Sequence, residues 1–149
     1  MTIIVSLHDA FELQTVHFSN GLDHHQLLAV YDFHNTHRDY AAADTVSIVA
    51  PETDLSALSL EQLDDVRRRY GILHSSLEFF VLRRSGWLCL APAARPALAC
   101  WLAGRHSLDG QGAEVAVATK LEELSGMFEP LELNAIATMK GFQTLLQIA

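Results

Sequence analysis

The order of apolar and polar positions along this chain predicts short strands that alternate with helices. The apolar residues 3–5 together with Leu7 predict a first strand, and residues 8–10 predict the turn that leaves it. Phe11 and Leu13 alternate with polar residues, which predicts a half-buried second strand in a hairpin with the first. The alternation slips at Thr15–Val16, where we expect a β-bulge.

The next two elements are predicted to be a helix and a buried strand. Asp23 is a suitable N-cap for a helix with an apolar stripe at helical spacing, formed by Leu27, Val30, Tyr31 and His34. The run from Thr45 to Ala50, with Val46, Ile48 and Val49, is typical of a strand that is covered on both faces.

A capping box predicts the start of the following helix. Ser59 and Gln62 have the spacing of that motif and precede an apolar run. We expect the helix to bury Leu63, Val66, Tyr70 and Leu73. Asp64–Asp65 precede Arg68–Arg69 by four residues, which is the favourable order for ion pairs along a helix.

The middle of the chain allows two interpretations. Residues 77–82 predict a strand, and residues 93–103 predict a helix. Between them, residues 84–86 are either the turn of a hairpin that returns through residues 87–90 or a simple loop.

The C-terminal part is predicted to be mostly helical. Residues 115–118 predict a short buried strand, and a second capping box at Thr119 predicts a helix that runs to about Phe128. Pro130 is expected to end that helix, and residues 131–148 predict a last one. The apolar residues of this stretch either cover the core of the domain or form a dimer contact.

This order of elements predicts the α/β class. Two strands followed by alternating helices and strands indicate a mixed β-sheet with an opening strand pair and helices packed on it. The 149 residues suit a single domain, 1–149, to which the last segment adds an extra C-terminal helix.

Composition and charge narrow the classes of function. Half of the residues are hydrophobic and 19% are charged, which excludes a disordered chain. The net charge of −8 argues against binding to nucleic acid or to an anionic membrane. The charge is uneven, however: residues 1–65 hold eleven acids and one base, and residues 66–105 hold seven arginines and one acid.

The sequence favours a cytoplasmic protein. No apolar run reaches the length of a membrane-spanning helix, and the first ten residues lack the basic region of a signal peptide. Cys89 and Cys100 are the only cysteines, which suits a reducing compartment.

The segment from Asp54 to Ser59 is the first candidate site. It leaves a buried strand and reaches a helix N-terminus, where free N–H groups favour an anion, a phosphoryl group or an acidic side chain of a partner. Turn and cap chemistry is the alternative explanation of Asp54, Ser56 and Ser59. Arg83 and Arg84 belong to the arginine-rich middle, which is either a patch for an acidic partner or a set of solvated ends.

Catalytic and metal chemistry have weaker support. His34 and His37 lie one helical turn apart and could form part of a zinc site with Asp32 or Asp39, but no third ligand has suitable spacing. The chain also lacks a Gly-x-Ser-x-Gly elbow and a Cys-x-x-Cys pair. We therefore expect no metal, no cofactor and no catalytic residue.

One segment resembles a known family. Residues 47–56 read Ser-Ile-Val-Ala-Pro-Glu-Thr-Asp-Leu-Ser and lead to the Ser59-capped helix, and residues 114–124 place a Glu-Val-Ala-Val strand before Leu-Glu-Glu-Leu. With the opening strand pair, this pattern resembles the STAS-like proteins, the sulfate-transporter and anti-sigma-antagonist domains, over residues 1–128. The helix of anti-sigma antagonists begins with Asp-Ser-Ser-Gly or Asp-Ser-Thr-Gly, whereas this chain has Ala57-Leu58-Ser59.

The resemblance implies a non-catalytic regulatory or interaction module. The partner would be another protein or a second copy of this chain, with a small anionic or apolar ligand as a further possibility. The alternative is a ligand carrier or an enzyme with a cleft lined by His34, His37 and nearby acids. A large apolar cavity would favour the carrier, converging histidines and carboxylates the enzyme, and a flat surface the interaction module.

Overall fold

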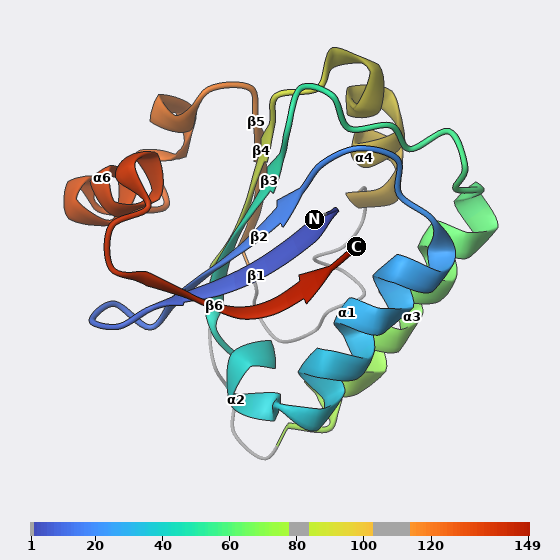
Figure 1. The fold of residues 1–149 in the computed structure, drawn as a ribbon, viewed down its shortest axis with the longest axis horizontal. Helices are drawn as coiled ribbons and strands as arrows, with labels where there is room; N and C mark the ends of the chain where they lie inside the picture. The colour runs from blue at the N-terminus through green and yellow to red at the C-terminus, as the bar shows by residue number, and fades with distance from the viewer. Residues whose placement is uncertain (1, 78–83, 103–113) are drawn as a thin grey trace.

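The chain forms a six-stranded mixed sheet with helices on both faces (Figure 1). The computed structural model describes residues 2–77, 84–102 and 114–149. The strands are β1 (Ile3–His8), β2 (Leu13–Phe18), β3 (Asp44–Val49), β4 (Arg84–Cys89), β5 (Glu114–Ala118) and β6 (Phe142–Ile148). The helices are α1 (His24–Thr36), α2 (Arg38–Ala41), α3 (Leu60–Ser75), α4 (Arg95–Leu102) and α6 (Pro130–Thr138), with single 3-10 turns η1 (Pro92–Ala94) and η2 (Leu121–Leu124).

The sheet has the predicted opening strand pair. Its order is β5-β4-β3-β2-β1-β6; β2, β3, β4 and β5 run parallel, and β1 is antiparallel to β2 and β6. The α/β class and the mixed sheet are thus confirmed. The bulge expected at Thr15–Val16 is wrong: the β1–β2 register is regular there, and the irregularity lies between Val5 and Ser6 in the β1–β6 pair. Both Thr15 and Val16 are buried because both faces of β2 are covered.

Two apolar cores lie on opposite faces of the sheet. Helices α1, α3 and α4 cover one face, where the larger core includes Val16, Val49 and Trp87. Helix α6 and the turn η2 cover part of the other face, where the smaller core includes Val46 and Leu88. Alternate residues of each central strand therefore belong to different cores.

Both predicted N-caps on the larger face are confirmed. Asp23 and Gln26 form a capping box at the start of α1, and Ser59 and Gln62 form one at the start of α3. The predicted stripes are also largely buried, and His74 is buried with them on α3. These local signals are strong because a cap satisfies backbone N–H groups without help from the rest of the fold.

Residues 84–86 are neither a hairpin turn nor a loop. They begin β4, which pairs in parallel with β3 and β5. Gly86 is needed for close packing, because a Cβ atom there would lie 3.0 Å from Phe128 Cε2 and 3.2 Å from Leu124 Cδ1. Most of the strand predicted at residues 77–82, and also Arg83, lie outside the described residues.

The segments around α4 and β5 follow the prediction only in part. The helix expected at 93–103 is the turn η1 followed by α4, and the described part ends at residue 102. The strand at 115–118 is confirmed within β5. The capping box at Thr119 is wrong: Lys120 occupies the N-cap of η2, and the Thr119 hydroxyl donates to Glu123 Oε1 at 2.8 Å.

The prediction of an extra C-terminal helix is also wrong for the second half of that segment. Pro130 begins α6 instead of ending a helix, and α6 stops at Thr138. Met139 (φ 56°) and Gly141 (φ 84°) then turn the chain into β6, which pairs with β1 along its length. The free edge of β1 supplies backbone partners that the apolar spacing of this segment does not reveal.

Candidate functional site

A pocket lies between the sheet and helices α1, α3 and α4. Its volume is about 90 Å³. The floor is the inner face of β2, β3 and β4, and the roof comes from these three helices and from Tyr40 and Ala41 of α2. Many of its lining side chains are polar, although this region is the centre of the larger core.

The pocket floor carries polar residues in register on neighbouring strands. Gln14 pairs with Thr45, and Thr45 pairs with Ser85, so their side chains share one face of the sheet. Ser47 follows Thr45 by two residues and shares that face. Gln14, Ser47 and Ser85 are buried. Such a group is unusual in a core, because buried polar atoms need partners.

A chain of hydrogen bonds crosses the pocket from floor to roof. The Gln14 amide nitrogen donates to the Tyr40 carbonyl at 3.1 Å and to Thr45 Oγ1 at 3.0 Å, so the amide oxygen is the acceptor. His34 Nε2 therefore donates to that oxygen at 2.9 Å. His34 Nδ1 is then the acceptor for the Tyr70 hydroxyl at 2.7 Å. Both ring nitrogens of His34 are thus engaged.

His34 is an uncharged histidine. His34 is only 5% exposed. Burial lowers the pKa of its imidazole to about 4, and the nearby His37 contributes a smaller part of this shift. At neutral pH the imidazole is therefore neutral and holds the single tautomer that Gln14 and Tyr70 select.

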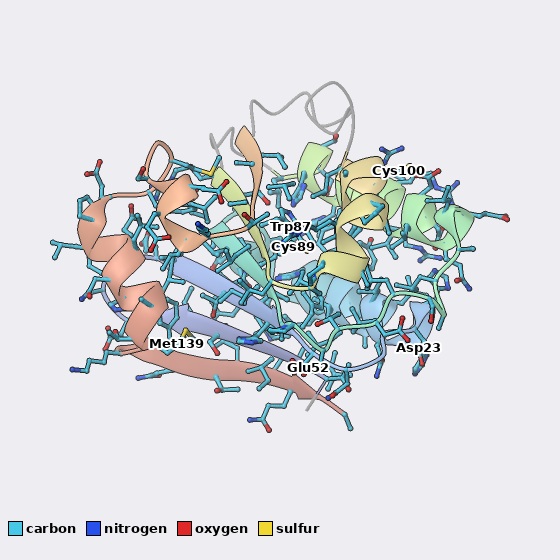
Figure 2. The ribbon with its side chains drawn as sticks, turned by 90° about the horizontal axis from the view of Figure 1, so that it is seen from above. Asp23, Glu52, Trp87, Cys89, Cys100 and Met139 are labelled. Atoms are coloured by element: carbon cyan, nitrogen blue, oxygen red, sulfur yellow. The ribbon has the colours of Figure 1, made fainter. Side chains whose placement is uncertain are left out.

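Two tryptophans form the end of the pocket. Trp87 of β4 and Trp101 of α4 make a T-shaped pair with ring centroids 5.4 Å apart. Figure 2 shows Trp87 in the interior of the molecule. Neither indole Nε1 has a hydrogen-bond acceptor among the described residues, although both atoms are buried. A buried donor without a partner costs about 1–3 kcal/mol, so each of these N–H groups needs an explanation.

Both arginines that line the pocket are paired with carboxylates. Arg67 contacts Asp64 Oδ1 at 3.2 Å and donates to the Trp101 carbonyl at 3.3 Å. Arg84 donates to Asp44 Oδ2 at 2.7 Å and to Glu132 Oε2 at 2.8 Å. Among the described residues that line the pocket, these two arginines are present and none is an aspartate or a glutamate.

The predicted segment from Asp54 to Ser59 has turn and cap geometry. Asp54 Oδ1 accepts from the Ser56 N–H at 2.9 Å, and bonds from Ser56 lower the pKa of this carboxyl. Ser59 Oγ accepts from the Gln62 N–H at 3.1 Å as the N-cap of α3. The alternative explanation from the sequence thus accounts for the contacts of these three residues.

The predicted site residues do not all come together. Asp54, Ser56 and Ser59 follow the C-terminal end of β3, whereas Arg84 begins β4. Since β3 and β4 are parallel, these positions lie at opposite ends of the sheet. Arg83 is outside the described residues.

The two histidines weighed as metal ligands have separate environments. His34 faces the pocket, whereas His37 is exposed and its Nδ1 lies 3.0 Å from the Phe33 carbonyl. Within residues 2–77, 84–102 and 114–149, no group of three or more histidine, cysteine or acidic side chains has a geometry for a metal. Cys89 is buried and Cys100 is exposed on α4, and neither forms a disulfide (Figure 2).

Sequence reasoning found only one residue of this pocket. It placed His34 and Tyr70 on apolar stripes, and its alternative of a cleft lined by His34, His37 and nearby acids named His34 alone among the residues that line the pocket. The useful signal was that polar residues occur within buried strands. Thr45 and Ser47 occupy alternate positions of β3, and Ser85 lies in β4. Side chains at those positions must face either a partner or a cavity.

Fold and pocket together describe a mixed α/β protein with a pocket between its sheet and its helices, lined by both apolar and polar side chains. Comparisons with protein-family models, with curated proteins and with solved structures found no match for this chain. Among the described helices, none has the length and apolar character needed to cross a bilayer.

Proposed function

We propose that this protein is a non-catalytic regulatory module of the STAS-like type, and that its central pocket binds one small molecule. The observation that carries the proposal is the pocket inside the larger core, whose floor holds the buried hydroxyl groups of Ser47 and Ser85 beside apolar side chains. A small molecule in the pocket can hydrogen-bond to these polar groups and contact the apolar walls.

The size of the pocket supports a ligand larger than water. Its volume of about 90 Å³ compares with roughly 30 Å³ for one water molecule in the liquid. The apolar side chains Val16, Val30 and Val66 line the pocket beside the polar groups. A cavity with apolar walls and a few placed polar groups is the usual form of a small-molecule site.

The state of His34 supports binding over catalysis. A general base needs a free nitrogen lone pair close to the substrate, but Nδ1 of His34 accepts from Tyr70 and Nε2 donates to Gln14. Among the described lining residues there is also no carboxylate that could act as an acid or a base.

The order of elements supports the STAS-like part of the proposal. An antiparallel strand pair, β1 and β2, precedes three strands that continue the sheet parallel to β2 and are joined through helices, which is the pattern on which the resemblance rests. Helices α1 and α3 line the pocket with one face and expose residues on the other, so a change in occupancy could be sensed by a protein partner. We further propose that the module acts in the cytoplasm, which the two unpaired cysteines favour.

Native mass spectrometry of protein taken directly from cells tests this function. The variant Ser47→Leu fills the pocket floor with an apolar side chain, and Ser56→Leu makes the same change in an exposed turn. We expect a bound small molecule on the wild-type chain and on Ser56→Leu, and none on Ser47→Leu. Circular dichroism confirms that each variant is folded.

Two results would contradict the proposed function. One is a wild-type spectrum without any small bound mass. The other is a folded Ser47→Leu protein that retains the bound mass in the same amount as Ser56→Leu.

A further inference from the structure

We propose that two copies of this chain associate through β6, whose outer edge pairs antiparallel with the same edge of the second copy and joins the two sheets into one. This inference goes beyond the binding of a small molecule and does not depend on the pocket. It rests on the position of β6 in the sheet, on the charge and exposure of its side chains and on the residues beside it.

β6 is the last strand of the sheet, at the side opposite to β5. It pairs with β1 along one edge, and among the described residues no strand pairs with its other edge. Figure 2 shows β6 along the border of the molecule, with no other described segment drawn beyond it. The terminal strand of a sheet presents backbone N–H and C=O groups that can pair with a strand of another chain.

β6 lacks the common features that prevent such pairing. Proteins protect terminal strands by making them short, by placing charged residues or proline in them, or by covering them. β6 has seven residues, and its sequence Phe-Gln-Thr-Leu-Leu-Gln-Ile contains neither a charged residue nor a proline. One irregularity, opposite Val5 and Ser6, divides it into two regular runs at 142–144 and 146–148. Each run can therefore pair on its outer side.

The absence of charge favours a second copy as the partner. About a two-fold axis the strand lies antiparallel to itself, so a charged side chain near the axis would lie close to the same charge on the other copy. β6 brings no such repulsion, although 19% of the residues of the chain are charged. The other terminal strand, β5, has only five residues and includes Glu114.

The exposed side chains of β6 also suit a symmetric pair. Gln143, Thr144 and Gln147 are exposed, and all three are polar and uncharged. Amide and hydroxyl groups can both donate and accept hydrogen bonds, so they can pair with the same groups on a second copy.

Apolar side chains extend this surface beyond the start of β6. Met139, just before the strand, is 37% exposed. Phe11 has the same exposure and stacks on His8, which also contacts the Phe142 ring. In an antiparallel pair, this end of one copy meets the end of β6 in the other, where Ile148 is half-buried. Burial of these side chains would add to the backbone pairing.

Analytical ultracentrifugation over a range of concentrations tests this association. Thr144→Lys places a charge in the middle of β6. Leu131→Lys is the matched control: it places the same charge on α6, at the most exposed large apolar residue of the described part (71%). We expect the wild-type chain and Leu131→Lys to form dimers, and Thr144→Lys to raise the dissociation constant of the dimer at least about tenfold. Circular dichroism confirms that each variant is folded.

Amide hydrogen exchange provides a second measurement that needs no variant. A higher concentration of the wild-type protein should slow exchange in residues 142–148, because pairing protects their outer N–H groups. Exchange in residues 114–118 of β5 should not depend on concentration.

Three results would overturn the inference. The first is a wild-type chain that stays monomeric at about 200 µM. The second is a dimer that folded Thr144→Lys preserves. The third is a dimer in which a higher concentration leaves exchange in residues 142–148 unchanged, and this result decides the matter if both variants dissociate or if Thr144→Lys is unfolded. None of these results bears on the pocket, whose occupancy is measured by the small bound mass in the native spectrum.

Discussion

At the scale of single residues, the protonation state of His34 affects the stability of the protein. The ring is buried between Gln14 and Tyr70, and it keeps one proton on Nε2. Burial lowers the pKa of His34 to about 4. Protonation of this histidine is therefore less favourable in the folded protein than in the unfolded chain. The histidine therefore contributes to stability only while it remains neutral.

This property predicts a dependence of stability on pH. The unfolded histidine has a pKa of 6.5 and the folded one about 4, so the unfolded chain binds more protons between these values. Stability should fall by about 3 kcal/mol as the pH decreases from 6.5 to 4. Urea unfolding at a series of pH values measures this loss.

Two variants isolate the contribution of His34. His34→Gln removes the titrating group and should flatten the profile between pH 6.5 and 4, even though its stability at pH 7 is lower. His25→Gln changes an exposed histidine of the same helix and should keep the wild-type slope. Equal slopes for the two variants would mean that burial of His34 does not control this pH range.

At the scale of elements, one arginine joins three segments that are far apart in the sequence. Arg84 of β4 contacts Asp44 at the start of β3 and Glu132 in the first turn of α6, and it donates to the Met127 carbonyl at 3.0 Å. Its guanidinium also stacks on the Phe128 ring, 4.6 Å from the centroid. The bonds to Arg84 hold the pKa of the Glu132 carboxyl below its usual range.

Replacing this arginine by lysine should destabilise the protein although the charge is kept. The guanidinium donates through three nitrogens to two carboxylates and a carbonyl, and an ammonium group cannot reproduce that geometry. We expect Arg84→Lys to lower the free energy of unfolding by about 1–3 kcal/mol, measured with urea at pH 7.

Arg68→Lys provides the matched control on α3. The Arg68 side chain is 71% exposed and contacts Asp65 at the surface, so this change should cost less than about 0.5 kcal/mol. An effect of Arg84→Lys as small as that of Arg68→Lys would show that the Arg84 contacts do not hold α6 to the sheet.

At the scale of the whole molecule, the C-terminal segment belongs to the same sheet as the N-terminus. β6 pairs with β1 from Ile3–Ile148 to His8–Phe142, and Leu145, Leu146 and Ile148 pack against the larger core. Of the two roles predicted for this stretch, packing on the body of the domain is thus observed. The dimer contact stays a prediction.

Removal of the last strand should therefore unfold the protein. A chain that ends at Thr138 loses β6, which leaves one edge of β1 unpaired and part of the core open. We expect no cooperative thermal transition by circular dichroism and poor dispersion in the NMR spectrum. A cooperative transition near that of the full chain would instead mean that β6 is a dispensable addition to the body.

The parts of the fold that the sequence predicted are those controlled by local chemistry. The capping boxes at Asp23 and Ser59 and the opening strand pair depend on residues close together in the chain. The second half of the C-terminal helix and the hairpin turn or loop at 84–86 were wrong, because the residues that pair or pack with these segments are distant in the sequence. The last segment forms β6 because it pairs with the free edge of β1. Position 86 is a glycine inside a strand because Phe128 packs closely against it.

The candidate site shows the same division. The sequence indicated that Asp54, Ser56 and Ser59 lie at a helix N-terminus, and their turn and cap contacts follow from spacing alone. It could not bring Gln14, His34 and Tyr70 together, since they come from β2, α1 and α3. Nor could it show that Arg84 lies at the opposite end of the sheet from Asp54.

By itself, the sequence determined the α/β class, the mixed sheet with its opening strand pair and the starts of the two long helices, because apolar periodicity and caps act over a few residues. Only the tertiary structure decided the last strand, the surroundings of Arg84 and the polar pocket. The physical reason is that strand pairing, burial and hydrogen bonding across the core depend on which distant residues meet, and that is settled when the whole chain packs.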